Sequence, residues 1–227
     1  MKILIMGATG GSGRAAAERL VAEGHEVTAF SRRGVAVAPG VRVVSGDAMN
    51  PADVARAVAG HDAVIVTLGI TENPLRVRLF GPRHTPAAVR SVGTRNVIAA
   101  MQAHGVRRLV VQTTFGVGAT RDRLGWLDAL FFALLLKPQI ADTEVQNREV
   151  IESGLEWVIA QPVHLTDDAD DDMPFASAAG ETGRLKVSRR SVARFLARAA
   201  TSAEFVGREV ALSRPVAPVS APARLPG

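Results

Sequence analysis

A run of glycines between an apolar segment and an alanine-rich segment constrains this fold more than any other feature of the sequence. Residues 3–6 have the pattern of a buried strand, and residues 12–23 that of a helix ending at Gly24. Between them stands Gly7-Ala8-Thr9-Gly10-Gly11-Ser12-Gly13. These glycines let the chain turn tightly and let its backbone approach a ligand. The segment predicts a strand–turn–helix unit with a binding site at the helix start; a turn that binds nothing is the alternative.

Further along, short β-rich runs alternate with helical patterns. Strands are expected at 26–30, 42–45, 63–67, 108–112 and 157–161, and helices at 51–58, 86–104 and 140–153. A helix at 188–200 and a short strand at 209–212 follow. Strands separated by helices predict an α/β fold of the doubly wound Rossmann type, with a mostly parallel sheet covered by helices on both faces. We expect one domain over 1–214 and a Pro/Ala-rich tail over 215–227.

In such a fold the helix N-terminus after the first strand binds the pyrophosphate of a dinucleotide, and the end of the second strand reads the adenosine ribose. That strand ends Phe30-Ser31-Arg32-Arg33 rather than in Asp or Glu. A guanidinium pairs with a 2′-phosphate and has no use for a hydroxyl donor, which favours NADPH over NADH as cofactor. Arginines exposed on an ordinary loop are the alternative.

Two further loops follow strands at the same edge of the predicted sheet. Asp47, with Ala48 after it, comes after the third strand and can accept a hydrogen bond from the adenine amine. Thr67-Leu68-Gly69 ends the fourth strand, where the cofactor crosses the sheet. Both positions depend on the rule that ligands bind outside the carboxyl ends of the strands.

Two residue types are missing from the chain of 227 residues: it has no cysteine and no tyrosine. The first absence excludes disulfides, thiol nucleophiles and metal sites built on cysteine, and the second excludes any mechanism that needs a phenolic acid. The formal net charge is +5. The basic residues are scattered, and no stacking-aromatic pattern accompanies them, so nucleic-acid binding is only weakly indicated.

The glycine motif with Arg32 resembles that of the atypical short-chain dehydrogenases, the NAD(P)H-binding group that includes NmrA-like proteins. Several segments are similar to the NADPH-dependent flavin reductases, also called biliverdin IXβ reductases; they lie at 58–66, 96–106, 152–155 and 162–165. The similarity covers residues 1 to about 165 well and the remainder loosely. The resemblance implies the Rossmann-type fold and NADPH as cofactor.

The resemblance also implies which residues face the nicotinamide and the substrate: Thr114 and His164 as catalytic residues, with Thr113, Pro162 and Val163 beside the cofactor. An equal alternative for His164 is a structural role, in which its side chain is hydrogen-bonded to nearby backbone. A second histidine of the flavin reductases is replaced here near Thr143. Lys137 remains, without the tyrosine that accompanies such a lysine in the common short-chain dehydrogenases.

The absence of tyrosine favours one class of hydride acceptor over another. Reducing a simple ketone creates an alkoxide, which demands a well-placed proton donor, whereas flavins and quinones delocalise the charge. We therefore expect an NADPH-dependent reductase of a conjugated small-molecule acceptor. The alternative is a non-catalytic NADP(H)-binding regulator of the NmrA-like type that senses redox state. A nucleotide-sugar epimerase or dehydratase is disfavoured by chain length and by the same missing phenol.

Three segments have no assigned role. The loop at 70–86, with three arginines and a histidine, is a lid, an anion clamp or a solvated loop. The apolar segment 126–136 roofs a pocket, forms a subunit interface or packs in the core. The acidic run 167–172 lacks the spacing of a calcium loop, so no metal site is expected; if it borders the pocket, it repels dianionic tetrapyrroles. We expect no membrane or nucleic-acid partner, a monomer or homodimer, and a cytoplasmic location.

Overall fold

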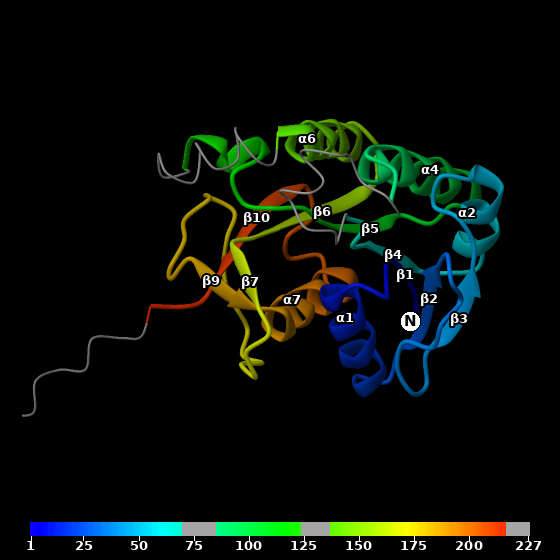
Figure 1. Ribbon diagram of the computed structural model, residues 1–227, viewed down its shortest axis with the longest axis horizontal. Coiled ribbons are helices and arrows are strands. Elements are labelled where there is room, and N and C mark those ends of the chain that lie inside the picture. Colours follow the sequence, from blue (N-terminus) through cyan, green and yellow to red (C-terminus); the bar gives the residue numbers. More distant parts are fainter. Residues whose placement is uncertain (70–84, 124–136, 217–227) are drawn as a thin grey trace, which may run out of the picture.

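The computed structural model describes residues 1–69, 85–123 and 137–216. Within these residues the main sheet has eight strands in the order β3-β2-β1-β4-β5-β6-β10-β8 (Figure 1). Neighbouring strands are parallel except for the edge pair β10 and β8, which is antiparallel. The strands are β1 (Lys2–Met6), β2 (Glu26–Ser31), β3 (Arg42–Ser45), β4 (Ala63–Val66), β5 (Arg108–Gln112), β6 (Glu156–Pro162), β8 (Phe175–Ser177) and β10 (Arg208–Ser213).

Helices cover both faces of this sheet. One layer consists of α1 (Gly11–Ala22) and α7 (Arg189–Thr201), and the other of α2 (Pro51–Val58), α4 (Val89–His104) and α6 (Lys137–Ile151) (Figure 1). The chain runs outward from β1 to β3 and then returns to place β4 on the other side of β1. This reversal is the switch point at which doubly wound sheets bind ligands. The predicted fold class is confirmed.

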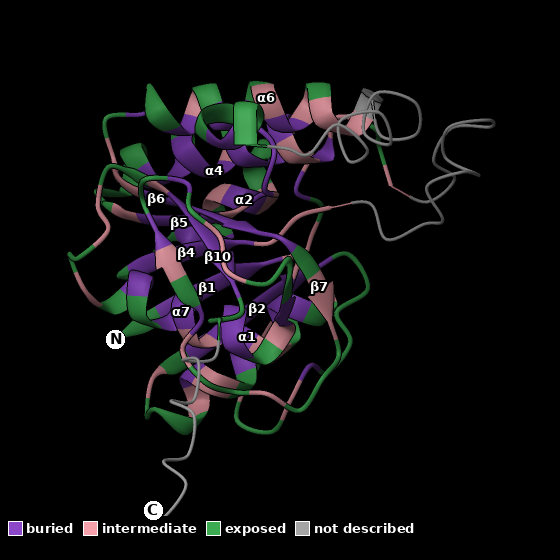
Figure 2. Ribbon diagram, turned by 90° about the vertical axis from the view of Figure 1, so that its left-hand side faces the viewer, coloured by how far each residue is buried: buried purple, intermediate pink, exposed green. Residues whose placement is uncertain are grey.

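The core lies in two layers, one on each side of the sheet. In β1, Ile3 and Ile5 pack with α1 and α7, while Leu4 and Met6 pack with α2 and α4. Successive side chains of a strand point to opposite faces, so a strand covered on both faces must be apolar throughout. Figure 2 shows the central strands buried between helices whose outer faces are exposed.

The local signals at helix ends act as the sequence predicts. Asn50 precedes α2, and its side-chain oxygen accepts a hydrogen bond from the Ala52 N–H at 2.9 Å. Pro51 occupies the first helical position, where its missing N–H costs nothing. Gly105 ends α4 in the left-handed conformation, with φ of 69°.

The start of α4 differs from the prediction. The expected helix begins at Pro86, whereas α4 begins at Val89. Its N-cap residue, Ala88, has no side chain that can accept a hydrogen bond; instead Asp142 of α6 accepts the backbone N–H of Arg90 at 3.1 Å and of Ser91 at 3.3 Å. The cap therefore comes from a residue about fifty positions away, which no local pattern reveals.

Several elements after β5 were missed in the sequence analysis. Besides β8, these are β7 (His164–Thr166) and β9 (Lys186–Ser188), which pair in parallel as a separate two-stranded sheet, and the 3₁₀ helix η1 (Gly118–Arg123). Each of these strands has three residues. Runs that short carry no readable alternation, so long-range pairing alone defines them.

The acidic run lies between β7 and β8 and is mostly exposed. Its carboxylates meet arginines of other elements: Asp170 pairs with Arg214, and Asp171 pairs with Arg19 and Arg194. Among the described residues there is no cluster of three or more histidine, aspartate or glutamate side chains that could hold a metal ion, and no helix long and apolar enough to cross a membrane. The expectations for residues 70–84 of the 70–86 loop, for the apolar segment 126–136 and for most of the tail fall outside the described residues.

Candidate dinucleotide site

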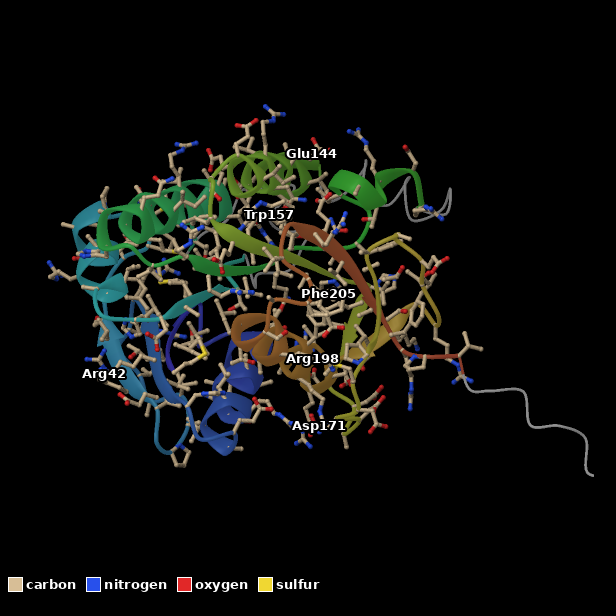
Figure 3. The ribbon with its side chains drawn as sticks, turned by 180° about the vertical axis from the view of Figure 1, so that it is seen from behind. Arg42, Glu144, Trp157, Asp171, Arg198 and Phe205 are labelled. Carbon is tan, nitrogen blue, oxygen red and sulfur yellow. The ribbon has the colours of Figure 1, made fainter. Side chains whose placement is uncertain are left out.

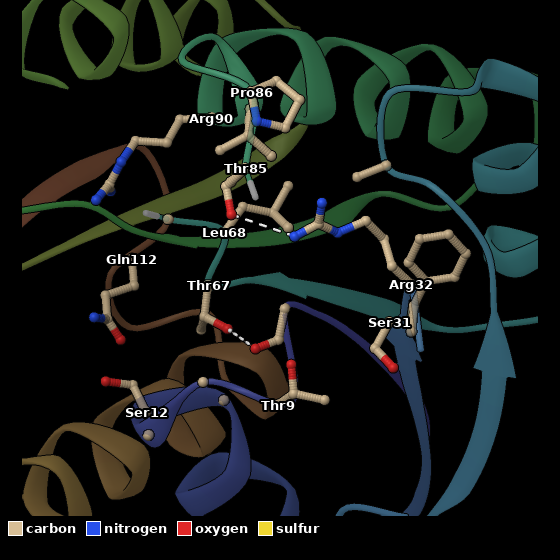
Figure 4. A pocket seen from close by; sticks show the side chains of 18 of the residues that line it. Thr9, Ser12, Ser31, Arg32, Thr67, Leu68, Thr85, Pro86, Arg90 and Gln112 are labelled. Atoms are coloured by element: carbon tan, nitrogen blue, oxygen red, sulfur yellow. Dashed lines mark hydrogen bonds between the residues drawn. The ribbon is translucent and has the colours of Figure 1, made fainter. Parts of the chain in front are cut away.

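A cavity of about 780 Å³ opens at the carboxyl edge of the sheet, beside the switch point between β1 and β4. This volume lies in the range of small-molecule and cofactor sites. Chain segments that are far apart in sequence meet there (Figure 4). The predicted residues that line it are Gly7, Thr9, Gly10, Gly11, Ser12, Gly13, Ser31, Arg32, Arg33, Asp47, Ala48, Thr67, Leu68, Gly69, Thr113 and Thr114.

The glycine turn forms the floor of the cavity because side chains would not fit there. A Cβ on Gly13 would lie 2.6 Å from the carbonyl oxygen of Gly7 and 2.7 Å from Thr67 Oγ1. Gly7 has φ of 83°, and a Cβ on it would lie 2.8 Å from the Thr67 carbonyl oxygen. Thr67 Oγ1 in turn donates to the Met6 carbonyl at 3.0 Å, which ties the turn to the end of β4.

The N-terminus of α1 has the character of an anion site. Its N-cap residue is Gly10, so no side chain accepts a hydrogen bond from the N–H groups of the first turn. Gly11, Ser12 and Gly13 of that turn all line the cavity. Backbone N–H groups and the positive end of the helix dipole together favour a phosphate at this position.

The end of β2 supplies the cationic side of the cavity. Arg32 donates from Nη2 to Thr85 Oγ1 at 3.3 Å, the contact drawn in Figure 4. Ser31 Oγ is buried and has no hydrogen-bond partner among the described residues. Nearby, Asp47 Oδ1 accepts the Met49 N–H at 3.0 Å, which fixes the loop after β3.

The end of β5 supplies a second group of polar atoms. Gln112 Oε1 and Thr113 Oγ1 are buried and have no hydrogen-bond partner within the described parts of the chain. Thr114 Oγ1 donates weakly to the Phe115 carbonyl at 3.4 Å. Buried polar atoms are almost always paired in native proteins, so orphaned atoms on a cavity wall indicate that a ligand completes them. The residues present therefore fit a dinucleotide that spans from β2 to β5.

Two arginines that the sequence analysis missed also line the cavity. Arg189 is the first residue of α7, and its side chain packs on the glycine turn, since a Cβ on Gly11 would lie 2.6 Å from Arg189 Cδ. Its Nη1 donates to Asp167 Oδ1 at 2.6 Å. The sequence around it offers no motif, and only the packing of α7 on α1 brings it to the turn.

The second missed residue is Arg90, in the first turn of α4. Its Nε is buried without a hydrogen-bond partner among the described residues. Burial lowers the pKa of Arg90 below its usual value, because desolvation disfavours the charged form, and the nearby Asp142 carboxylate opposes this shift only in part. On sequence alone this position is an ordinary arginine of a helix.

Three of the predicted residues lie outside the cavity lining. Pro162 and Val163 are buried at the end of β6, where Val163 donates its N–H to the Leu212 carbonyl at 3.0 Å. His164 is exposed at the start of β7, and its neighbour Leu165 lines the cavity in its place. Thr143 is buried within α6 and donates to the Gln139 carbonyl at 2.8 Å. The catalytic roles of Thr114 and His164 stay predictions.

Fold and cavity together define a Rossmann-type protein with a candidate dinucleotide site at its switch point. A sequence model described as NAD(P)H-binding matches residues 7–203. The chain belongs to this NAD(P)H-binding family, as the sequence resemblance implies.

Solved structures with the same fold include a Rossmann-fold NAD(P)-binding family protein from Shigella flexneri, which is 25% identical over 94% of this chain and 93% of that one, with a TM-score of 0.68. The anaerobillin reductase ChuY from Escherichia coli O157:H7 is 23% identical over 96% of this chain and 100% of that one, with a TM-score of 0.75. A short-chain dehydrogenase/reductase from Veillonella parvula, in complex with NADP, is 18% identical over 94% of both chains, with a TM-score of 0.73.

Proposed function

We propose that the protein is an NADPH-dependent reductase that transfers hydride to a conjugated acceptor such as a flavin or a quinone. One observation carries the proposal: a single cavity joins a cationic end at β2, an uncapped helix N-terminus at α1 and orphaned polar atoms at the end of β5. Named reductases among proteins of the same fold, including ChuY, support the reaction class.

At the β2 end, Arg32 and Arg33 would hold the 2′-phosphate of the cofactor. A guanidinium has five N–H donors, so the hydrogen bond from Arg32 to Thr85 is compatible with binding a phosphate. The N–H groups at the start of α1 would hold the diphosphate, and Gln112 and Thr113 would orient the nicotinamide end. When bound there, NADPH supplies the hydride.

Catalysis would come mainly from positioning, since the chain contains no tyrosine that could donate a proton. An acceptor that delocalises the charge of the incoming hydride can be protonated afterwards by water. Thr114, on the cavity wall, would hydrogen-bond beside the reacting atoms. His164 is exposed and would act only through a change in position or through water.

The decisive experiment measures NADPH and NADH binding by calorimetry and then follows nicotinamide absorbance with a panel of flavins and quinones. We expect tighter binding of NADPH and turnover of at least one acceptor. Tighter binding of NADH would remove the assigned role of Arg32. A folded protein that binds neither coenzyme would overturn the proposal as a whole.

One observation favours a second candidate, a non-catalytic NADP(H)-binding regulator. The histidine expected to act as the acid does not line the cavity, and the chain has no tyrosine to replace it. For such a protein, the same experiment gives tight NADPH binding with no turnover of any acceptor.

A further inference from the structure

The cavity has a second cationic wall, which the proposed cofactor contacts do not use. Arg90 enters it from α4, on the side opposite the glycine turn of α1, and its guanidinium lies toward Gln112 and away from Arg32 (Figure 4). The backbone of Arg90 is held in place, because Asp142 accepts its N–H at 3.1 Å. Its Nη2 lies 3.0 Å from the place that a Cβ on Gly69 would take, so the guanidinium rests on the backbone at the end of β4.

The guanidinium of Arg90 forms no ion pair in the described part of the chain, although the nearby Asp142 carboxylate partly favours its charge. Asp142 is the nearest candidate, but its oxygens accept the backbone N–H groups of Arg90 and Ser91 and the Ser91 hydroxyl, not the guanidinium. The Nε of Arg90 is buried and unpaired. A partly buried cation is stabilised by pairing, so the Arg90 guanidinium is suited to bind an anion that enters the cavity.

The cofactor phosphates have other partners. The N-terminus of α1 and Arg189, which packs on Gly11, lie at the diphosphate position, and Arg32 and Arg33 lie at the adenosine end. Arg90 stands on the remaining wall, beside the end of β5 where the acceptor meets the nicotinamide. Apolar side chains of Leu68, Val89 and Leu165 also line the cavity and suit a flat conjugated ring.

The charges of the residues that line the cavity also favour an anionic acceptor. Its described ionisable residues are four arginines and a single acid, Asp47, which lies with the adenosine-binding loops. The acidic run 167–172 contributes no residue to the lining, but its Asp167 neutralises Arg189 at 2.6 Å, which leaves Arg32, Arg33 and Arg90 against Asp47. An anion that enters therefore meets a positive potential with low-dielectric walls.

We propose that Arg90 binds a carboxylate of the acceptor, so that the preferred acceptors are conjugated molecules carrying a carboxylate group. The planar guanidinium matches a carboxylate through two parallel hydrogen bonds, which fixes the acceptor ring as well as holding it. This inference rests on the proposed reductase function for its acceptor. Its binding step can be tested apart from turnover.

The experiment compares Arg90→Met with wild-type protein on a matched pair of quinones, a naphthoquinone and its carboxylate-bearing derivative. We expect the KM for the carboxylate compound to rise roughly tenfold or more, while the KM for the neutral quinone and the Kd for NADPH stay within about twofold. Arg190→Met is the control, since Arg190 is exposed on α7 and does not line the cavity. Arg90→Lys, which keeps the charge, should lie between the two.

A binding arm separates this inference from the reductase proposal. Calorimetry with NADP⁺-saturated protein compares 2-naphthoate with 2-naphthamide, neither of which accepts hydride. Wild-type protein should bind the acid at least about tenfold more tightly, and Arg90→Lys should lose part of that preference. Equal binding of the two probes, or no binding of either, overturns the inference even if a quinone is reduced. A weaker NADPH Kd in Arg90→Lys or Arg90→Met assigns Arg90 to the cofactor instead.

Discussion

At the scale of single residues, the assignment of NADPH depends on Arg32. Replacing it with alanine would remove the proposed charge-assisted hydrogen bonds to the 2′-phosphate, which NADH does not have. We expect the Kd for NADPH to rise about 10- to 100-fold and the Kd for NADH to change by less than about twofold. Calorimetry of Arg32→Ala beside Arg56→Ala, an exposed arginine paired with Asp53, measures both. An equal loss for the two coenzymes would mean that Arg32 only holds the loop.

The glycine turn offers a sterically matched pair of variants. In Gly13→Ala the new methyl would lie 2.6 Å from a backbone carbonyl, whereas in Gly10→Ala the nearest contact is 3.4 Å. We expect Gly13→Ala to lose about 1–3 kcal/mol of unfolding free energy together with coenzyme binding, and Gly10→Ala to lose clearly less. Urea denaturation and NADPH titration of both proteins test this; similar losses would show that the close approach to the Gly7 carbonyl is not what requires glycine at position 13.

Some residues of the cavity could be predicted from the sequence, and others could not. Arg32 and Gly13 could be placed because a strand–turn–helix pattern fixes where they fall relative to a dinucleotide. Arg90 and Arg189 could not, since their roles depend on how α4 and α7 pack over the sheet and not on any local spacing. His164 was expected in the site by resemblance, yet the three-residue strand that it begins turns it toward solvent.

At the scale of elements, α4 depends on α6 for its N-terminus. Asp142→Asn removes the anionic acceptor that caps Arg90 and Ser91, and we expect a loss of about 1–2 kcal/mol in unfolding free energy. Glu144→Gln is the control: Glu144 lies on the outer side of α6 (Figure 3) and pairs with the exposed Arg121, so its loss should stay within about 0.5 kcal/mol. Thermal or urea unfolding distinguishes the two, and equal effects would contradict the capping role.

Some helices and strands are determined by local sequence patterns, and others by contacts between distant parts of the chain. The strands and helices of the parallel sheet could be predicted within a few residues, because both core layers leave a periodic apolar pattern. The 42–45 strand and the 51–58 helix match their predicted bounds. β7, β8 and β9 could not be predicted, since pairing partners such as Lys186 for His164 lie far along the chain.

At the scale of the whole molecule, unfolding should become easier in acid through His61. This buried side chain contacts Thr28 Oγ1 through Nε2 at 2.9 Å and the Val58 carbonyl through Nδ1 at 3.3 Å. Burial, and to a lesser extent the charge of Arg42, lowers the pKa of His61 in the folded state. The unfolded chain therefore takes up this proton first as pH falls, and stability present above about pH 6.5 is lost below it.

The measurement is the unfolding free energy of wild-type protein and of His61→Gln at about pH 8 and about pH 5. We expect the wild-type value to fall more steeply than that of His61→Gln. His104→Gln changes an exposed histidine at the end of α4 and should keep the wild-type slope. A slope unchanged in His61→Gln would show that other groups dominate the acid response.

The pairing of Arg189 with Asp167 gives the cavity a built-in counter-ion. The Asp167 side chain is 88% exposed, so it neutralises the guanidinium beside Gly11 while remaining free to leave it. An anion that binds at the glycine turn must share that guanidinium with Asp167 or displace the Asp167 carboxylate. Binding of an anion at the glycine turn would thus exchange one counter-ion of Arg189 for another. Because Asp167 lies in the segment that joins β7 to β8, this exchange would also affect that segment.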